Sequence, residues 1–369
     1  MKNSLLKSFE LYPRRDNDSS FYIRVPYARI LASRLAVGSS VARCNPASGF
    51  TLVELMVAIA LGLLIVAASV QLFITGVTSY KLQKAMSFIQ DNASLGLNFI
   101  IDDIRKANLS APVPAVNDKV GYAGIILTQD NVGDKIDLNC TACFSNDKLA
   151  NFGDANITGG KKNDQLIIRY QAPYSSVDCS GKDVVKDTFV VQRYFVHDQA
   201  TSIGTRPLSC QAAQYTQTDL DRIGENDDRL SLVWQTEQVI LPNVDYFKVR
   251  VGYIDGGLND ADSSIAYADI QDYIALDKSA NKYKKNIDGV IQFVPPHVHA
   301  IQIGVLVQSE DNAGNQAVVK EKNKTEFTMF GDEKVKLASQ YQNTHLRQVV
   351  EQTISLRNAM GWVNEGAES

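Results

Sequence analysis

The sequence lacks the short motifs that mark the best-known catalytic and nucleotide-binding sites. It contains no GxSxG nucleophile elbow, no GxxxxGK[ST] phosphate loop and no HExxH zinc motif. Histidine is also scarce, with only four residues in 369, which are His197, His297, His299 and His345. These absences remove the main sequence signals for a hydrolase, an NTPase or a metalloprotease. They predict a protein that is not an enzyme and needs no cofactor.

Two weaker patterns bear on metal binding. His297 and His299 would share one face of a strand, but no third ligand can be assigned to them. The acidic segment 255–264, DGGLNDADSS, resembles a calcium loop only loosely, because the glycine and the terminal glutamate of an EF-hand are missing. We interpret it as a solvated loop and predict no metal site. A membrane-anchored periplasmic enzyme remains an alternative, and these two histidines would be the first residues to test for it.

Charge and proline are absent from a long stretch near the N-terminus. Residues 55–74, LMVAIALGLLIVAASVQLFI, carry no charge and are numerous enough to cross a bilayer as a helix. No proline interrupts residues 50–111, and Pro112 and Pro114 then end the helical pattern. An ordinary secretory signal cut near Ala67 and Ala68 is an alternative, but the run is longer than a typical signal core and continues without a break.

The charges on the two sides of this segment differ in sign. Residues 1–49 hold eight basic and three acidic side chains, a net charge of +5, and the chain total of −4 leaves −9 for the remainder. A basic segment before a membrane helix predicts a cytoplasmic N-terminus and an exported remainder. The acidic remainder argues against direct binding of nucleic acid, which depends on neutralising phosphates.

Cysteine is used sparingly, with five residues in the chain. Cys44 precedes the apolar segment, and the even set Cys140, Cys143, Cys179 and Cys210 follows it. On the exported side this set suggests two disulfides, for which three pairings are possible. We favour Cys140–Cys143 with Cys179–Cys210. A redox or zinc site at CTAC is the alternative, but neither a βαβ pattern nor a second matched cysteine pair supports it.

The pattern after the apolar segment predicts a helix laid against a sheet. The helical period continues to about Asn108, through an apolar stripe made of Leu82, Met86, Ile89, Ala93, Leu97, Ile100 and Ile104. From Gly121 short β-rich runs follow: GIILTQ, DQLIIRY, TFVVQRYFV, RLSLVWQ, VDYFKVRVGYI, HAIQIGVLVQSE and TEFTMF. Apolar residues alternate at 247–253 and at 301–307, which is typical of half-buried antiparallel strands. The segment QYQNTHLRQVVEQTISLRN could be strand or helix.

The residues GFTLVELM at 49–56 resemble the signal of type IV prepilins. This resemblance implies removal of the leader 1–49 by prepilin peptidase between Gly49 and Phe50, N-methylation of Phe50, and an assembly role for Glu54, the fifth residue of the mature chain. Later stretches, among them FIIDDIRKANL, HAIQIGVLVQS and LRQVVEQTISLRN, are similar to PilW-type minor pilins, and the J-type pseudopilins of type II secretion are related to them. Cys44 would leave with the leader.

The physical chemistry of Glu54 agrees with this expectation. A carboxylate is costly within a bilayer, although less so near a helix end. Cleavage after Gly49 would place a new ammonium group one turn away, so Glu54 could pair with its own N-terminus and the helix dipole. It could instead pair with the amine of a neighbouring subunit, which would favour one axial register between packed helices.

The expected organisation is an α+β, type IV pilin-like fold. It comprises a leader (1–49), the transmembrane half of a helix (50–74), its amphipathic half (75–108) and a β-rich domain outside the cytoplasm (109–369). The resemblance implies a minor pilin that primes assembly, first in the inner membrane and then in the filament, with roles at the tip in twitching motility, adhesion or DNA uptake. Its partners would be prepilin peptidase, major and minor pilins and a tip adhesin. The alternative is a pseudopilin of type II secretion.

Overall fold

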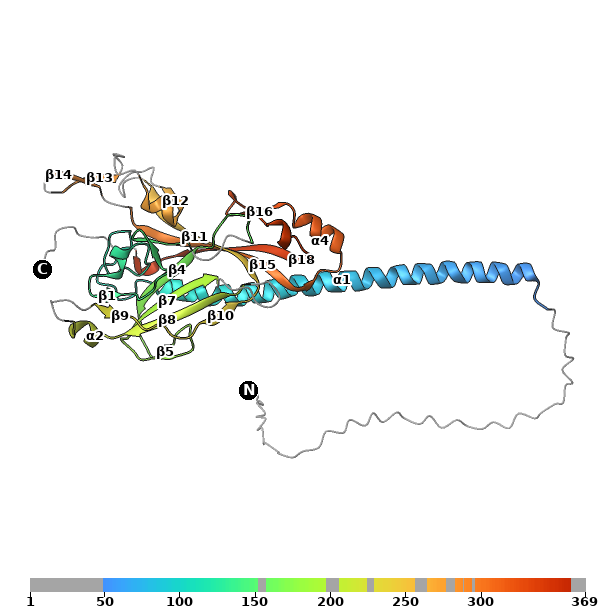
Figure 1. Cartoon of the computed structure of the whole chain (residues 1–369), viewed down its shortest axis with the longest axis horizontal. Helices are drawn as coiled ribbons and strands as arrows, with labels where there is room; N and C mark the ends of the chain where they lie inside the picture. The colour runs from blue at the N-terminus through green and yellow to red at the C-terminus, as the bar shows by residue number, and fades with distance from the viewer. Residues whose placement is uncertain are drawn as a thin grey trace, which may run out of the picture. The chain divides into compact units, whose positions relative to one another are not determined.

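The structure is a computed structural model that describes residues 49–151, 157–196, 206–223, 229–255, 264–276, 283–287, 289–293 and 296–359. It divides into two units, one that ends at Gly62 and one that begins at Leu63. In chain order, one long apolar helix is followed by a domain built mainly of antiparallel strands (Figure 1). The predicted α+β class, with a long N-terminal helix and a β-rich domain after it, is confirmed.

Helix α1 runs from Leu52 to Lys106. Its first part is apolar enough to cross a membrane, and the most hydrophobic window contains no buried residue. The second part packs on the β domain through a stripe of Ala85, Ile89, Ala93, Leu97, Ile100, Ile101 and Ile104. The predicted stripe is therefore correct over most of its length, with one error.

The error concerns Met86, whose side chain is 42% exposed, whereas its neighbour Ala85 is buried. Small residues on this face let the helix approach the sheet closely. At Gly96 an added Cβ would lie 2.9 Å from the carbonyl oxygen of Ile240 and 3.1 Å from Cβ of Leu241. Side-chain size therefore decides which helix face contacts the sheet. Hydrophobicity alone selects Met86, one residue away from the buried Ala85.

The helix ends before the prolines that were expected to stop it. Asn108 adopts a left-handed conformation with φ 65°, as residues after a helix C-terminus often do. Its side-chain amide donates to the carbonyl oxygens of Val113 and Asn358, and its Oδ1 accepts from the N–H of Gly124 at 2.8 Å. The backbone N–H of Asn108 donates to the carbonyl of Arg169. The helix end is therefore joined to the sheet by one asparagine.

Two four-stranded antiparallel sheets form the body of the domain. The first has the order β10-β8-β7-β4 and consists of β4 (Gln165–Gln171), β7 (Phe189–Val196), β8 (Leu208–Tyr215) and β10 (Gln238–Leu241). The second has the order β12-β11-β15-β18 and consists of β11 (Val244–Asp255), β12 (Ser264–Asp269), β15 (Val298–Asn312) and β18 (His345–Ser355). The C-terminal segment that sequence left open is thus a strand.

The alternation of apolar residues in the sequence correctly predicted which face of the second sheet is buried. Phe247, Val249 and Val251 in β11 are fully buried, and so are their counterparts at 301–307 in β15. Both sets belong to the same apolar core as the stripe of α1. The two sheets also contact directly, because the N–H of Asp164 donates to the carbonyl of Phe247 at 2.9 Å.

Two predicted strands are wrong or much shorter. GIILTQ forms only isolated bridges at Ile125 and Thr128: the N–H of Ile126 donates to the carbonyl of Ile167, but a buried side chain takes the next two N–H groups. Oδ1 of Asn131 accepts from the N–H groups of Leu127 and Thr128, and its Nδ2 donates to two loop carbonyls. RLSLVWQ retains a two-residue strand, β9, which pairs in parallel with β1.

The remaining elements are short and join the strands of the two sheets. The helices are η1 (Gln129–Val132), α2 (Gln217–Asp221), α3 (Ile270–Ile274), α4 (Gln316–Lys322), η3 (Ser339–Tyr341) and η4 (Arg357–Ala359). The strands are β1 (Ile136–Asp137), β2 (Phe144–Ser145), β3 (Lys148–Leu149), β5 (Ser176–Val177), β6 (Asp183–Val184), β9 (Leu230–Ser231), β13 (Lys284–Ile287), β14 (Val290–Phe293), β16 (Glu326–Met329) and β17 (Glu333–Lys336).

Candidate functional site

The segment before α1 has no regular secondary structure and is exposed. Gly49 has no atom within 4 Å of the position that a Cβ would occupy, and the side chain of Phe50 is 84% exposed. Nothing in the described part of the chain therefore covers the bond between these two residues. An exposed bond outside regular secondary structure is accessible to a protease.

A local motif fixes the start of the helix. Oγ1 of Thr51 accepts from the N–H of Glu54 at 3.2 Å, and the carbonyl of Thr51 accepts from Leu55 at 3.1 Å. Thr51 therefore caps the helix, and Glu54 occupies the third helical position, where a carboxylate complements the positive end of the dipole. Sequence reasoning identified Glu54 but overlooked the Thr51 cap, although the pattern T-x-x-E signals it.

Glu54 stands out on this surface because its neighbours are apolar. The side chains around it, including Val53, Leu55 and Val57, are all more than half exposed. Together they form an apolar helix surface with one carboxylate in its first turn. Such a surface is stable in lipid or against similar helices, because water would solvate it poorly.

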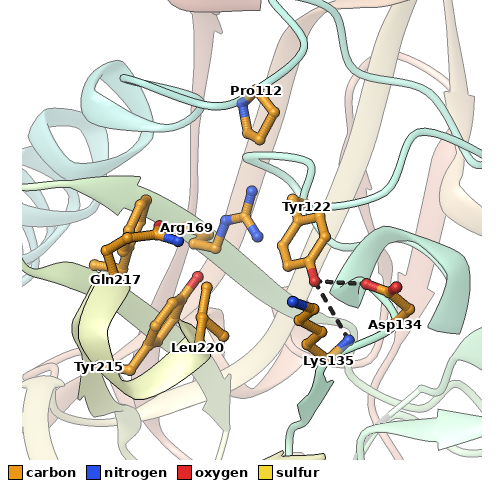
Figure 2. Close-up of a pocket in the computed structure, with 9 residues that line it drawn as sticks. Pro112, Tyr122, Asp134, Lys135, Arg169, Tyr215, Gln217 and Leu220 are labelled. Carbon is orange, nitrogen blue, oxygen red and sulfur yellow. Dashed lines mark hydrogen bonds between the residues drawn. The ribbon is translucent and has the colours of Figure 1, made fainter. Parts of the chain in front are cut away.

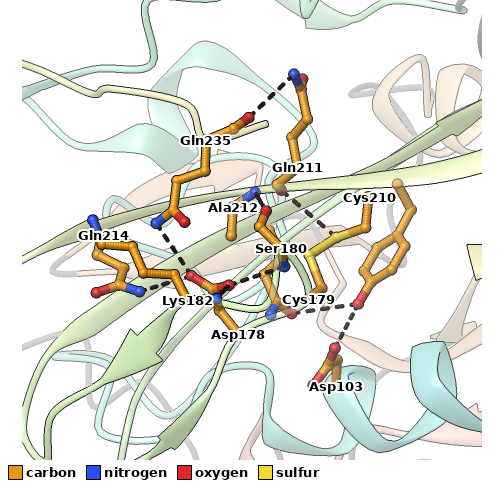
Figure 3. The surroundings of a disulfide bond; sticks show 12 residues. Asp103, Asp178, Cys179, Ser180, Lys182, Cys210, Gln211, Ala212, Gln214 and Gln235 are labelled. Atoms are coloured by element: carbon orange, nitrogen blue, oxygen red, sulfur yellow. Dashed lines mark hydrogen bonds between the residues drawn. A yellow bond between two sulfur atoms is a disulfide. The ribbon is translucent and has the colours of Figure 1, made fainter. Parts of the chain in front are cut away.

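Both disulfides of the β domain are present in the structure, in the pairing that sequence favoured. Cys140 bonds to Cys143, and Cys179 bonds to Cys210 across a sequence separation of 31. Figure 3 shows that the second bond joins the β5–β6 turn to strand β8. Next to it, the carboxylate of Asp178 accepts from the side-chain amides of Gln214 and Gln235. These bonds hold the turn on the sheet.

A buried hydrogen bond near this disulfide joins α1 to the first sheet (Figure 3). The hydroxyl of Tyr194 in β7 donates to Oδ2 of Asp103 at 2.5 Å, and Lys106 pairs with the other oxygen of Asp103 at 2.8 Å. Burial, followed by the nearby Asp103 charge, raises the pKa of Tyr194 well above its usual value, so the phenol stays protonated and can donate. Asp103 is not part of the apolar stripe predicted from the sequence, yet it is only 8% exposed.

The domain also contains a cavity of about 320 Å³ beside the end of α1 (Figure 2). Its walls come from the loop after α1, from η1 and its flanks, from three strands of the first sheet and from α2; its lining residues are Pro112, Tyr122, Asp134, Lys135, Arg169, Phe189, Tyr215, Gln217 and Leu220. Sequence reasoning gave no hint of this cavity, because its residues come from five separate segments.

The three histidines that the structure describes do not assemble into a metal site. His299 lies in β15, where burial lowers its pKa, and His297 immediately precedes that strand. Nδ1 of His345 lies 2.9 Å from the carbonyl oxygen of Ser309. Within the described ranges, no group of three His, Cys, Asp or Glu side chains could hold a metal ion. His197 and nearly all of the acidic segment 255–264 lie outside the described residues.

Comparison with known proteins yields two family matches. Residues 44–70 match the prokaryotic N-terminal methylation motif, and residues 193–358 match the type IV pilus-assembly protein W family. No curated protein matches the chain. Among solved structures, a type IV-like pilin from Thermus thermophilus aligns with 11% identity over 73% of this chain and 98% of its own, with a TM-score of 0.31.

The two family matches lie where the structure places the two functional parts of the chain. The methylation motif covers the exposed Gly49–Phe50 segment and the start of α1, and the second match runs from β7 to η4. The resemblance found in GFTLVELM is thereby confirmed by an independent match in the β domain. The chain thus has a type IV prepilin-type N-terminus in residues 44–70 and a domain similar to the PilW family in residues 193–358, and together these matches support a minor pilin.

Proposed function

We propose that this minor pilin primes assembly of a type IV filament and contributes to the complex at its tip, where it supports twitching motility, adhesion or DNA uptake. In this proposal prepilin peptidase cuts between Gly49 and Phe50 on the cytoplasmic face, and Phe50 is then methylated. The mature subunit crosses the inner membrane once, with its β domain outside the cytoplasm. There it meets major and minor pilins and a tip adhesin. Its role is structural and involves no catalysis.

One observation carries the proposal: an uncovered apolar helix has a single carboxylate in its first turn. The first part of α1 buries none of its apolar side chains against the domain, so another surface must cover them. Lipid can do so before assembly, and the helices of other subunits can do so afterwards. Glu54 would then lose water and need a positive partner, which the N-terminal amine of an adjacent subunit supplies.

The proposal predicts a specific defect in the Glu54→Ala variant. The variant should be cleaved and inserted normally, because the Gly49–Phe50 bond and the apolar run are intact. Its recruitment into filaments should fall at least about tenfold. Removing one partner of a charge pair that is desolvated on assembly costs several kcal/mol of the free energy that favours the correct axial register between subunits. The measurement is the amount of this subunit in sheared filaments relative to the amount in the inner membrane.

Asp91→Ala is the matched control, because Asp91 is an exposed carboxylate on the same helix that only accepts from Ser87. This control should assemble like the wild type. Normal incorporation of Glu54→Ala would contradict the register argument. If the subunit were recovered with a secretion machine and never with pili, the chain would be a pseudopilin.

A further inference from the structure

The cavity beside the end of α1 contains a buried cation that lacks a full set of partners. Arg169 points from β4 into the space between Pro112 and Tyr122 (Figure 2). Its side chain is 3% exposed and donates a hydrogen bond to the hydroxyl of Tyr215, but its Nη1 has no hydrogen-bond partner among the residues that the structure describes. Burying a guanidinium without such partners is costly, because the lost hydration is not replaced. Violations of this kind concentrate at functional or strained sites.

The aromatic residues around Arg169 are held in fixed positions. The guanidinium lies 5.2 Å from the ring centroid of Tyr122. The hydroxyl of Tyr122 donates to Oδ1 of Asp134 at 2.6 Å and accepts from the N–H of Lys135. The ring also packs so closely on Gly133 that a Cβ there would lie 2.5 Å from it. Tyr122 itself has φ 55°, a strained conformation for a bulky residue that surrounding contacts must maintain.

A second wall is mainly aromatic. Phe189 and Tyr215 are paired across β7 and β8, and their rings stack with centroids 5.0 Å apart. Leu220 of α2 adds an aliphatic surface. Val191 pairs with both Arg169 and Ala213 across the strands, and Val191 and Ala213 belong to the packed core beneath the cavity. A ligand here therefore needs an apolar body as well as a charged group.

The charges of the cavity favour a monoanion. Arg169 and Lys135 supply two positive charges, and Asp134 supplies one negative charge that is occupied by the Tyr122 hydroxyl. The net charge of +1 matches one carboxylate and falls short of a dianionic phosphate. A carboxylate is also planar, as a guanidinium is, so the two can share two parallel hydrogen bonds.

We propose that this cavity binds a carboxylate carried on an apolar or aromatic body, with Arg169 as the group that recognises the carboxylate. The volume of about 320 Å³ lies at the small end of ligand pockets and suits one amino-acid-sized group. The same chemistry is offered by a free aromatic acid and by the C-terminal residue of a polypeptide. The site does not depend on the assembly role proposed above, and its test requires no filament.

The test is calorimetric titration of the full chain in detergent with N-acetyl-L-phenylalanine and with its amide. The acid should bind, and the uncharged amide should bind about 10- to 100-fold more weakly, because it cannot form the charge-assisted pair. A peptide that ends in a free C-terminal phenylalanine, compared with its amidated form, identifies the source. Binding of the free-acid peptide indicates a polypeptide partner, and binding of the small acid alone indicates a free metabolite-sized ligand.

The Arg169→Met variant separates a ligand group from a structural one. It fills the same space without a buried charge, so it should lose binding of the acid while its thermal midpoint stays the same or rises. The matched control is Arg193→Met, another buried arginine of the first sheet, whose Nε donates to Gln165 at 2.8 Å. That control should bind the acid normally and unfold at a lower temperature.

Three results would overturn the proposal. They are no heat of binding for either the acid or the free-acid peptide at millimolar concentration, equal affinity for acid and amide, and unchanged affinity in Arg169→Met. A fall in the thermal midpoint of Arg169→Met like that of Arg193→Met, with binding retained, would assign Arg169 to the core.

Discussion

At the scale of single residues, the clearest electrostatic feature is the buried carboxylate of Asp164. It lies between the two sheets, accepts from the N–H of Val249 at 2.9 Å and pairs with Nζ of Lys248 at 3.3 Å. Burial raises the pKa of Asp164 to about 6, and the Lys248 charge only partly opposes this effect. In the unfolded chain the same group titrates near pH 3.9.

The raised pKa predicts how stability depends on pH. Between about pH 4 and about pH 6 the folded state holds a proton on Asp164 that the unfolded state has released, so this group lowers the free energy of unfolding as pH rises. The full effect is about 3 kcal/mol. Urea unfolding of residues 79–369 at pH 4 and pH 7 should show Asp164→Asn gaining that amount relative to wild type. Parallel pH profiles for the two proteins would refute this assignment.

The limits of sequence reasoning are also clearest at single residues. The periodic spacing of hydrophobic residues correctly predicted the buried face of α1 and the inner faces of β11 and β15, because each pattern repeats over many residues. It misplaced Met86 because the fit depends on the size of Ala85 and Gly96, which only the facing sheet defines. It made a strand of GIILTQ because nothing in that run shows that the side chain of Asn131 takes over its backbone N–H groups.

At the scale of elements, the two disulfides should differ in their contribution to stability. In the chain-entropy account a bond restricts the unfolded chain more when it closes a longer loop. Cys179–Cys210 has a sequence separation of 31 and Cys140–Cys143 one of 3, which corresponds to about 4 and about 2 kcal/mol. The longer bridge also fastens the β5–β6 turn to β8, close to the Asp103–Tyr194 bond that holds the end of α1 (Figure 3).

We therefore expect the double variant Cys179→Ala/Cys210→Ala to lose more stability than Cys140→Ala/Cys143→Ala. The measurement is chemical denaturation of residues 79–369 expressed in an oxidising compartment, and each double variant serves as the control for the other. An equal loss in both would show that the bridges act mainly through local native packing.

The candidate sites differ in how well they could be predicted from the sequence. The reason is the separation along the chain between the residues that form each site. Gly49, Phe50 and Glu54 lie within six consecutive residues, so their spacing is readable without a fold. The cavity around Arg169 is assembled from segments between Pro112 and Leu220. Its residues come together only when β4, β7 and β8 pair, and that pairing is a property of the whole domain.

At the scale of the whole molecule, removal of the leader would leave a subunit whose first residue is Phe50. We expect mass spectrometry of protein from the native host to find a mature chain that starts at a methylated Phe50. A chain that begins at residue 1, or beyond Ala67, would contradict the prepilin assignment of the cleavage site.

Substitution of the glycine before the cut tests the same step without disturbing the fold. A Cβ at Gly49 would meet no atom of this chain within 4 Å, so Gly49→Val leaves the subunit's own packing intact. We expect it to block processing, because the branched side chain occupies space that glycine leaves free for close approach of the backbone to the peptidase cleft. Gly62→Ala is the control, since a Cβ there also meets nothing. It should be processed normally, and normal processing of both variants would show that the peptidase does not read Gly49.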